Sequence, residues 1–187
     1  MRKTFLALLF ISLCPFFVLA QDDVSAVEVF GGYSYLRTGT YDQDNHGWNT
    51  AIAVNVSKHF AIAADFAGHY DRYSKNGANV NTSIHTYLFG PQVNFRASEK
   101  VNPFVHALFG AAHQNVTAKT AATKISSSQT GFGMALGGGL DIKLNDSISW
   151  RMFQADYLLT RYNDPFTAPL KRRNIHNFRL STGLVFQ

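Results

Sequence analysis

The sequence predicts an all-β protein that folds as an eight-stranded antiparallel up-and-down transmembrane β-barrel. Apolar and polar residues alternate with period two over most of the chain after residue 20, as in strands with one apolar face. The joints between these stretches alternate between short and long, which is typical of outer-membrane barrels. After residue 20 no apolar run approaches the ~20 residues of a transmembrane helix, so a membrane crossing would use strands.

The N-terminus has the pattern of a secretory signal peptide. Arg2 and Lys3 precede an apolar run over about residues 5–19, and a small residue, Ala20, follows at a cleavage position. The sequence therefore predicts a signal peptide over 1–20 that is removed. An uncleaved anchor is the weaker alternative, because the run is short for a bilayer span and Pro15 interrupts it.

The remaining residues, 21–187, are predicted to form a single β-barrel domain. The one cysteine, Cys14, lies in the removed segment, so the mature chain has no thiol for a disulfide, a metal or catalysis. Of the 17 Lys and Arg residues two are removed, and the other 15 against 12 acidic residues give a formal net charge of +3. These cations are spread along the chain except at 171–173, so no nucleic-acid surface is indicated.

The strands follow from the alternation. Between Trp48 and Ser57 the even positions carry large apolar or β-branched side chains and the odd ones small or polar side chains; a short turn then leads into the alternating run from Phe60. This is a hairpin pattern. The same parsing places eight strands at residues 27–37, 48–57, 60–71, 83–96, 103–114, 129–143, 147–160 and 174–186. Long polar joints over 38–47, 72–82, 115–128 and 161–173 predict four extracellular loops.

The two faces of the strands favour a membrane barrel over a soluble one. In a soluble β-protein, the face of the sheet that is exposed to water is rich in Lys, Glu and Thr. Here the polar face holds small residues and isolated charges, and the lysines fall in joints or at strand ends. Such a face suits the narrow interior of an eight-stranded barrel, while the aromatic face suits hydrocarbon. A soluble lipid-binding barrel is the alternative fold.

Two groups of side chains are singled out. The first is a charged and polar network in the lumen, where an unpaired charge would cost several kcal/mol. It consists of Glu28, Asp65, His69, His106, Asp141, Arg151, Gln154, Asp156 and Arg179. The second is a set of lipid-interface aromatics near the strand ends. It consists of Trp48, Tyr70, Phe95, Trp150, Tyr157 and Phe186.

The strand over 147–160 predicts an irregularity. Strict alternation would place Arg151 on the face of Phe153 and Tyr157, opposite Gln154 and Asp156. A β-bulge near Met152 or Phe153 would add one residue and shift the phase. All three polar side chains would then face the lumen.

Five segments resemble the OmpA-like small outer-membrane β-barrel family, the outer membrane protein β-barrel domain. They are "YLFGPQVNF", "NPFVHALFGAAH", "ALGGGLDIKLND", "WRMFQADYLLTR" and the final "NFRLSTGLVFQ". The resemblance covers residues 27–187. It implies a Gram-negative outer-membrane location with the bilayer and lipopolysaccharide as surroundings, and it says little about function, because the family includes adhesins and structural anchors.

Catalytic and metal sites are not indicated. The seven histidines show no metal-ligand spacing, so neither a metal nor another cofactor is expected; four of them, His46, His69, His113 and His176, could gather near the outer rim. Asp65 and His69 could form a dyad on one face, but no serine in a nucleophile context accompanies them, and His176 and Ser181 are five residues apart and hence on opposite faces.

The expected function is therefore a structural or surface-interaction role of the adhesin type, with a possible extracellular ligand bound by the loops. In this interpretation the charged network plugs the lumen and no reaction is catalysed. A narrow ion channel and a lipid-modifying enzyme are the alternatives. An eight-stranded barrel is barely wide enough for its own side chains, which speaks against a pore.

Overall fold

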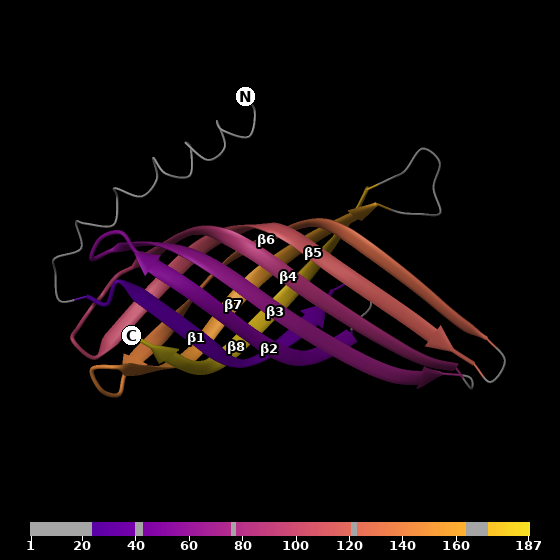
Figure 1. Ribbon diagram of the computed structural model, residues 1–187, viewed down its shortest axis with the longest axis horizontal. Coiled ribbons are helices and arrows are strands. Elements are labelled where there is room, and N and C mark those ends of the chain that lie inside the picture. The colour runs from indigo at the N-terminus through magenta and orange to yellow at the C-terminus, as the bar shows by residue number, and fades with distance from the viewer. Residues whose placement is uncertain (1–23, 40–42, 76–77, 121–122, 164–171) are drawn as a thin grey trace, which may run out of the picture.

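The computed structural model describes residues 24–39, 43–75, 78–120, 123–163 and 172–187. These residues form one closed antiparallel barrel in which each strand pairs with its sequence neighbours and the last strand pairs with the first (Figure 1). The predicted eight-stranded barrel is confirmed. Its strands are β1 (Val27–Thr38), β2 (Gln43–Asn55), β3 (Phe60–Lys75), β4 (Ala78–Asn94), β5 (Val101–Lys119), β6 (Lys124–Lys143), β7 (Ile148–Asn163) and β8 (Arg172–Phe186). The predicted signal peptide lies outside the described residues.

The two ends of the barrel differ. The turns after β2, β4 and β6 lie at the same end as the C-terminus, and β3 to β6 reach farthest at the opposite end (Figure 1). We call these the turn end and the projecting end. Backbone hydrogen bonds close the turns; for example, Leu144 N donates to Ile148 O at 3.0 Å. No helix in the described ranges is long and apolar enough to cross a membrane.

β1 and β8 close the barrel. Their ladder runs from the pair Val29–Phe186 to the pair Thr38–Asn177. Closure pairs the backbone groups of both edge strands, which a hydrocarbon environment requires because it offers no water to replace those hydrogen bonds. The barrel body therefore has no open sheet edge, whereas beyond it residues 71–75 of β3 and 124–131 of β6 are paired on one side only.

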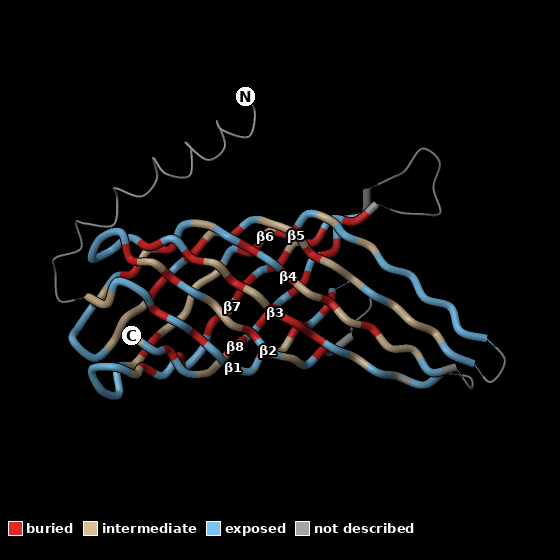
Figure 2. Tube along the Cα trace, viewed as in Figure 1, coloured by how far each residue is buried: buried red, intermediate tan, exposed pale blue. Residues whose placement is uncertain are grey.

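Within the barrel body, buried side chains alternate with more exposed ones along the strands (Figure 2). On β3, Ala61, Ala63 and Asp65 are buried, whereas Phe60 and Ile62 are 42% and 55% exposed. The exposed face is thus the apolar one, the reverse of a water-soluble sheet and typical of a barrel surrounded by lipid. The six predicted interface aromatics are all exposed: Trp48, Tyr70, Phe95, Trp150, Tyr157 and Phe186.

The strands at the projecting end are longer than predicted. Residues 115–128 were expected to form one long joint, but 115–119 and 124–128 pair with each other as the ends of β5 and β6. Likewise β3 and β4 stay paired to Lys75 and Ala78. The predicted long loops are wrong for these two joints and also for the joint over 38–47, of which residues 43–47 pair with β1. Both faces of a strand meet water beyond the membrane, so the apolar alternation stops while Thr, Ser, Val and Ile continue the ladder.

β7 contains the predicted β-bulge. In the ladder with β6, Leu140 pairs with Phe153 and Asp141 pairs with Arg151, so Met152 is the extra residue. The register against β8 shifts at the same place. Met152 and Phe153 are both exposed, and Arg151 is buried. The bulge is confirmed, and it lets the polar residues on both sides of it face the lumen.

Deleting Met152 is expected to leave the barrel folded, with a loss of less than about 2 kcal/mol in the free energy of unfolding. The deletion removes the extra residue, so β7 alternates regularly and Arg151 still lies opposite Asp141. Deleting Leu158, which is fully buried in a regular part of the strand, should cost about 2–5 kcal/mol or prevent folding. Urea unfolding in detergent compares the two; equal losses would contradict the argument.

The lumen contains an apolar cluster that the sequence interpretation did not include. Leu36, Ile84, Leu88, Leu108 and Leu158 are at most 7% exposed and cluster with inward-facing alanines. The expected interior held small and charged residues only, and this is a correction. Several strands are apolar on both faces at this level, so alternation alone does not tell which leucines face inward.

Candidate functional site: the lumen and the projecting sheet

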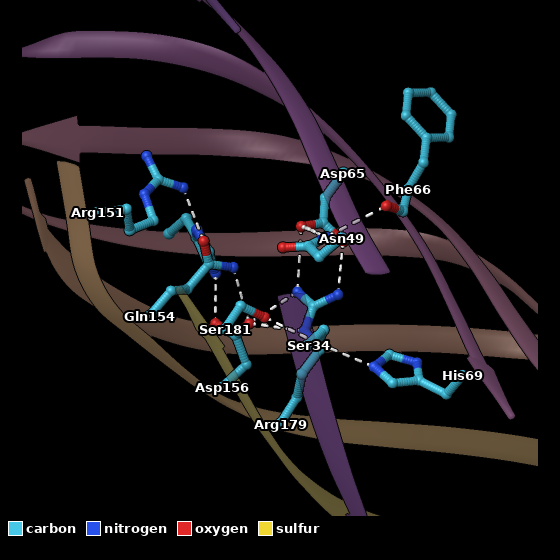
Figure 3. A network of polar contacts seen from close by, with 11 residues as sticks. Ser34, Asn49, Asp65, Phe66, His69, Arg151, Gln154, Asp156, Arg179 and Ser181 are labelled. Carbon is cyan, nitrogen blue, oxygen red and sulfur yellow. Dashed lines mark hydrogen bonds and ion pairs between the residues drawn. The ribbon is translucent and has the colours of Figure 1, made fainter. Parts of the chain in front are cut away.

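Arg179 on β8 lies at the centre of the lumen network (Figure 3). Its guanidinium donates to Asp65 Oδ1 on β3 at 2.7 Å, and its Nε donates to Asp156 Oδ2 on β7 at 2.9 Å. All three side chains are at most 1% exposed. Because β3 and β8 are not neighbours in the sheet, the Arg179–Asp65 pair crosses the lumen.

Gln154 joins this cluster to a second ion pair. Arg151 Nε and Nη2 donate to the two carboxylate oxygens of Asp141 at 2.8 and 2.9 Å, a bidentate geometry. Arg151 Nη1 donates to Gln154 Oε1 at 2.7 Å, and Gln154 Nε2 donates to Asp156 Oδ2 at 2.9 Å. The amide therefore uses both of its ends and makes the two pairs one continuous network.

Two aromatic rings enclose Arg151. The guanidinium carbon lies 4.4 Å from the ring centre of Phe30 and 4.2 Å from that of Phe104. Both rings are 2% exposed. Stacking of this kind stabilises a weakly hydrated guanidinium inside protein, where an ammonium group would fit less well.

The two predicted lumen histidines have different partners. His106 Nε2 donates to Asp156 Oδ1 at 2.7 Å, so His106 belongs to the network. His69 Nε2 lies 2.9 Å from Ser34 Oγ, which lies 2.9 Å from Ser181 Oγ. Among the described residues His69 Nδ1 has no hydrogen-bond partner.

Glu28 is predicted in the same network, but it lies in a separate cluster at the turn end. Its Oε1 accepts hydrogen bonds from Asn55 Nδ2 at 2.8 Å and from Arg96 Nη2 at 3.2 Å. Arg96 also donates from Nε to Lys58 O at 2.6 Å, and it adopts a left-handed backbone with φ of 44°. The sequence interpretation missed Arg96, because it falls beside a turn where alternation carries no signal.

A cavity of about 590 Å³ opens at the turn end. Glu28, Arg96 and Asp141 lie in its wall, so the cavity ends on the buried polar clusters. Nearby, Lys143 Nζ lies 2.9 Å from Asp146 Oδ1 in an exposed turn, and this hydrogen bond lowers the pKa of the Asp146 carboxyl.

The structure does not assemble the catalytic candidates. Asp65 accepts hydrogen bonds from Arg179, while the ring of His69 is turned to Ser34. His176 is exposed and contacts the hydroxyl of Tyr157, and Ser181 is buried on the opposite face.

The rim histidines also do not gather. His46 contacts the hydroxyl of Tyr33, and His113 contacts Thr130, on different strands of the outer face. Within the described ranges no three His, Cys, Asp or Glu side chains are placed to hold a metal ion.

β3 to β6 form a four-stranded sheet that continues past the other strands at the projecting end (Figure 1). These strands have 16, 17, 19 and 20 residues, whereas β1 has 12. The row Arg72, Asn81, Thr117 and Ser126 crosses all four strands in register. We call the part of β3–β6 beyond Tyr70 and its register partners the projecting sheet.

A closed barrel with an apolar outer face and a polar, charged lumen defines an integral β-barrel protein of the bacterial outer membrane. The chain belongs to the outer membrane protein beta-barrel domain family, whose model matches residues 5–186. Proteins of this class lie in the outer membrane of Gram-negative bacteria. No curated protein matches the sequence.

Solved structures of two surface proteins share the fold. Ail, the attachment invasion locus protein of Yersinia pestis, has 16% identity and a TM-score of 0.58, over 86% of this chain and 96% of Ail. Ail has also been solved in complex with the heparin analogue sucrose octasulfate. Neisserial surface protein A has 11% identity and a TM-score of 0.57, over 86% of this chain and 94% of that one. At these identities the likeness concerns the fold.

Proposed function

We propose that the chain is a closed outer-membrane barrel that does not conduct ions and that displays the projecting sheet at the cell surface for contact with an extracellular partner. The observation that carries the proposal is the pairing of β3–β6 to Lys75, Ala78, Lys119 and Lys124, well beyond the barrel body. In outer-membrane barrels the short turns face the periplasm, so this sheet faces outward.

Two groups of side chains support a closed lumen. The network around Arg179 and the leucine cluster that includes Leu88, Leu108 and Leu158 both fill it, and Leu88 lies opposite Asp65 in the β3–β4 ladder. An ion on this path would have to displace a paired guanidinium and pass buried leucines. The wild-type protein in planar bilayers is expected to show no conductance. Regular channel openings would contradict the proposal that the barrel is closed to ions.

Outward display is tested by labelling with a membrane-impermeant maleimide on intact cells. Ser126→Cys, on the projecting sheet, should be labelled without permeabilisation, whereas Ser98→Cys, in the turn after β4, should be labelled only after it. The single native cysteine lies at position 14, which keeps the background low. The opposite pattern would reverse the orientation.

The interaction role is tested by shortening β5 and β6. A variant that replaces residues 116–127 with a two-residue turn keeps the barrel body and loses the projecting hairpin. Cells expressing it should attach less to surfaces coated with extracellular matrix than cells with the intact protein. Equal attachment would overturn the role.

We also propose that the chain catalyses no reaction on membrane lipids, since His69 and Asp65 are committed to other partners. Mass spectrometry of lipid A from cells with and without the protein should show the same species. A new species that disappears with His69→Ala would overturn this proposal.

A further inference from the structure

Above the barrel body, β6 is an edge strand. Its residues 124–131 pair with β5, and among the described residues they have no partner on the side of β7, whose ladder with β6 ends at the pair Phe132–Arg161. We propose that this open edge binds an extended segment of an extracellular protein, which adds to the projecting sheet as a further strand with acidic residues on its outer face and apolar residues on its inner face. The inference rests on the proposed outward display of the sheet and adds the chemistry of the partner.

The backbone of the open edge offers unused hydrogen-bonding groups. At the two ends of the β5–β6 ladder, Thr120 N donates to Thr123 O at 2.8 Å, and Lys143 N donates to Lys100 O at 2.8 Å. Both bonds place the odd-numbered residues of β6 in the hydrogen-bonded pairs with β5, and in an antiparallel ladder the residues between them turn their N–H and C=O groups to the other side. On the open edge these are Lys124, Ser126, Ser128 and Thr130. Their donors and acceptors form the template that β-strand addition uses.

The side chains of these residues do not cover the edge. Ser126 Oγ lies 3.2 Å from Thr117 Oγ1, and Ser128 Oγ lies 3.3 Å from His113 Nε2, both on β5. Thr130 Oγ1 lies 2.8 Å from His113 Nδ1. The hydroxyl groups thus bond across the ladder with β5 and leave the backbone groups on the other side open to a partner strand.

The open edge lacks most features that protect natural edge strands, such as proline, a β-bulge or an inward-pointing charge. Residues 124–131 contain no proline, and their one charged residue, Lys124, lies on the outer face at the tip. The β5–β6 register also runs without a shift. Because hydrocarbon cannot replace the missing hydrogen bonds, this stretch lies in water, where a partner protein can reach it.

The inner face of the sheet beside the open edge is apolar. Ile125 is 67% exposed, the highest value among the exposed large apolar side chains of the described residues. It lies opposite Ala118 on β5, which lies opposite Val80 on β4, so the three side chains form an apolar row that ends at the edge. An apolar residue of a partner strand beside Ile125 would continue this row and remove apolar surface from water.

The outer face beside the open edge is positively charged. Lys124 lies at the upper end of the edge, opposite Lys119, and Arg161 lies at the lower end, opposite Phe132. All three cations are exposed, and in the described ranges no carboxylate forms an ion pair with any of them. Acidic side chains of a partner strand would offset these charges. A second copy of this chain would bring the same cations to the edge, so charge favours an acidic partner over self-association.

Synthetic peptides test the strand addition on the purified protein in maltoside micelles. The probe is a fluorescein-labelled peptide as long as the open edge in which glutamate and valine alternate, and fluorescence anisotropy follows its binding. Methyl groups on one alternating set of peptide nitrogens should abolish binding, and methyl groups on the other set should leave it unchanged, because only every second N–H of an added strand points to the edge. A peptide with lysine in place of glutamate should bind about tenfold more weakly.

Ser128→Pro blocks the edge and leaves the β5–β6 hydrogen bonds in place. Proline is tolerated in edge strands and removes the N–H group that points away from β5, so the glutamate–valine peptide should bind about tenfold more weakly. The matched control, Ser128→Ala, loses the hydroxyl group but keeps the N–H group and should bind like the wild type. If heat-dependent gel mobility shows that Ser128→Pro does not fold, the two methylated peptides give the answer with the wild type.

A charge variant tests the acidic character of the partner. Lys124→Gln combined with Arg161→Gln removes the cations at both ends of the open edge and should weaken binding of the glutamate–valine peptide by about threefold. The matched control, Lys58→Gln combined with Lys100→Gln, removes the same charge at the turn end and should bind like the wild type.

Any of the following results would overturn the proposal: equal effects of the two methylated sets, wild-type affinity of a folded Ser128→Pro variant, or equal affinity for the glutamate and lysine peptides. Sedimentation that shows a self-associated wild type and a monomeric Ser128→Pro variant would also overturn it, because the edge would then belong to a second copy. These measurements use purified protein and do not depend on its orientation in the membrane. The maleimide test reports on the display of the sheet separately, so the two failures can be told apart.

Discussion

Replacing Arg179 with methionine is expected to lower the free energy of unfolding by about 3–5 kcal/mol, one of the two largest effects predicted for a single substitution in this chain. Arg179 is fully buried and holds Asp65 and Asp156 from two other strands. Without the guanidinium both carboxylates are left in a closed lumen with fewer donors, and their repulsion is no longer offset. Methionine has a similar length, so little of the loss comes from a cavity.

Urea unfolding of the refolded protein in detergent, followed by fluorescence of Trp48 and Trp150, measures this loss. Arg161→Met, which removes an exposed arginine of β7, is the control and should change stability by less than about 0.5 kcal/mol. The triple variant Asp65→Asn, Asp156→Asn and Arg179→Met should recover most of the stability, because it removes the charges together. A single variant as stable as the wild type, or a triple variant no better than the single one, would contradict the electrostatic explanation.

Much of this fold follows from the sequence because a barrel in lipid inverts the usual pattern. On a strand such as β3, Phe60, Ile62 and Phe66 lie on one face, and Ala61 and Asp65 lie on the other. The apolar face carries too many large aromatic side chains to fit inside a narrow barrel. The position of the bulge follows in the same way. Strict alternation would place Arg151 and Asp156 on opposite faces of β7, and a single extra residue between them puts both on the lumen face.

The parts that the sequence does not predict have two physical origins. The ends of β5 and β6 lie in water on both faces, so nothing in the pattern of Asn115–Lys119 distinguishes a paired strand from a loop. The partner of Glu28 is Arg96, 68 residues away and in a left-handed conformation beside a turn. Such a contact depends on how the closed barrel brings its strands together, and no local periodicity records it.

The partners of the network residues show the same limit. The charges named from the sequence lie in the lumen, yet their pairing depends on distances across it. Gln154 connects two ion pairs, and the ring of His69 is turned away from them to Ser34. Alternation assigns each of these side chains to a face, whereas the shear and closure of the barrel decide which of them meet.

Gly137→Ala is expected to lower the free energy of unfolding by about 3 kcal/mol, although the change adds one methyl group. Gly137 lies opposite Asp156 in the β6–β7 ladder. A Cβ at this position would lie 2.1 Å from Asp156 Oδ1 and 2.3 Å from the carbonyl oxygen of Ala155. One of these atoms is backbone, so a side-chain rotation cannot relieve the contact, and a shift of Asp156 would loosen its bonds to Arg179 and His106.

Gly31→Ala is the matched control for this change. No atom lies within 4 Å of a Cβ at Gly31, which is exposed on the outer face of β1, so the substitution should leave stability unchanged or raise it by up to about 1 kcal/mol. Urea midpoints of both variants, with heat-dependent gel mobility as a check on folding, give the comparison. Equal stabilities of the two variants would mean that the lumen accommodates an added methyl group. A lumen that adapts so easily could also admit ions. This result would therefore contradict a tightly filled, non-conducting barrel.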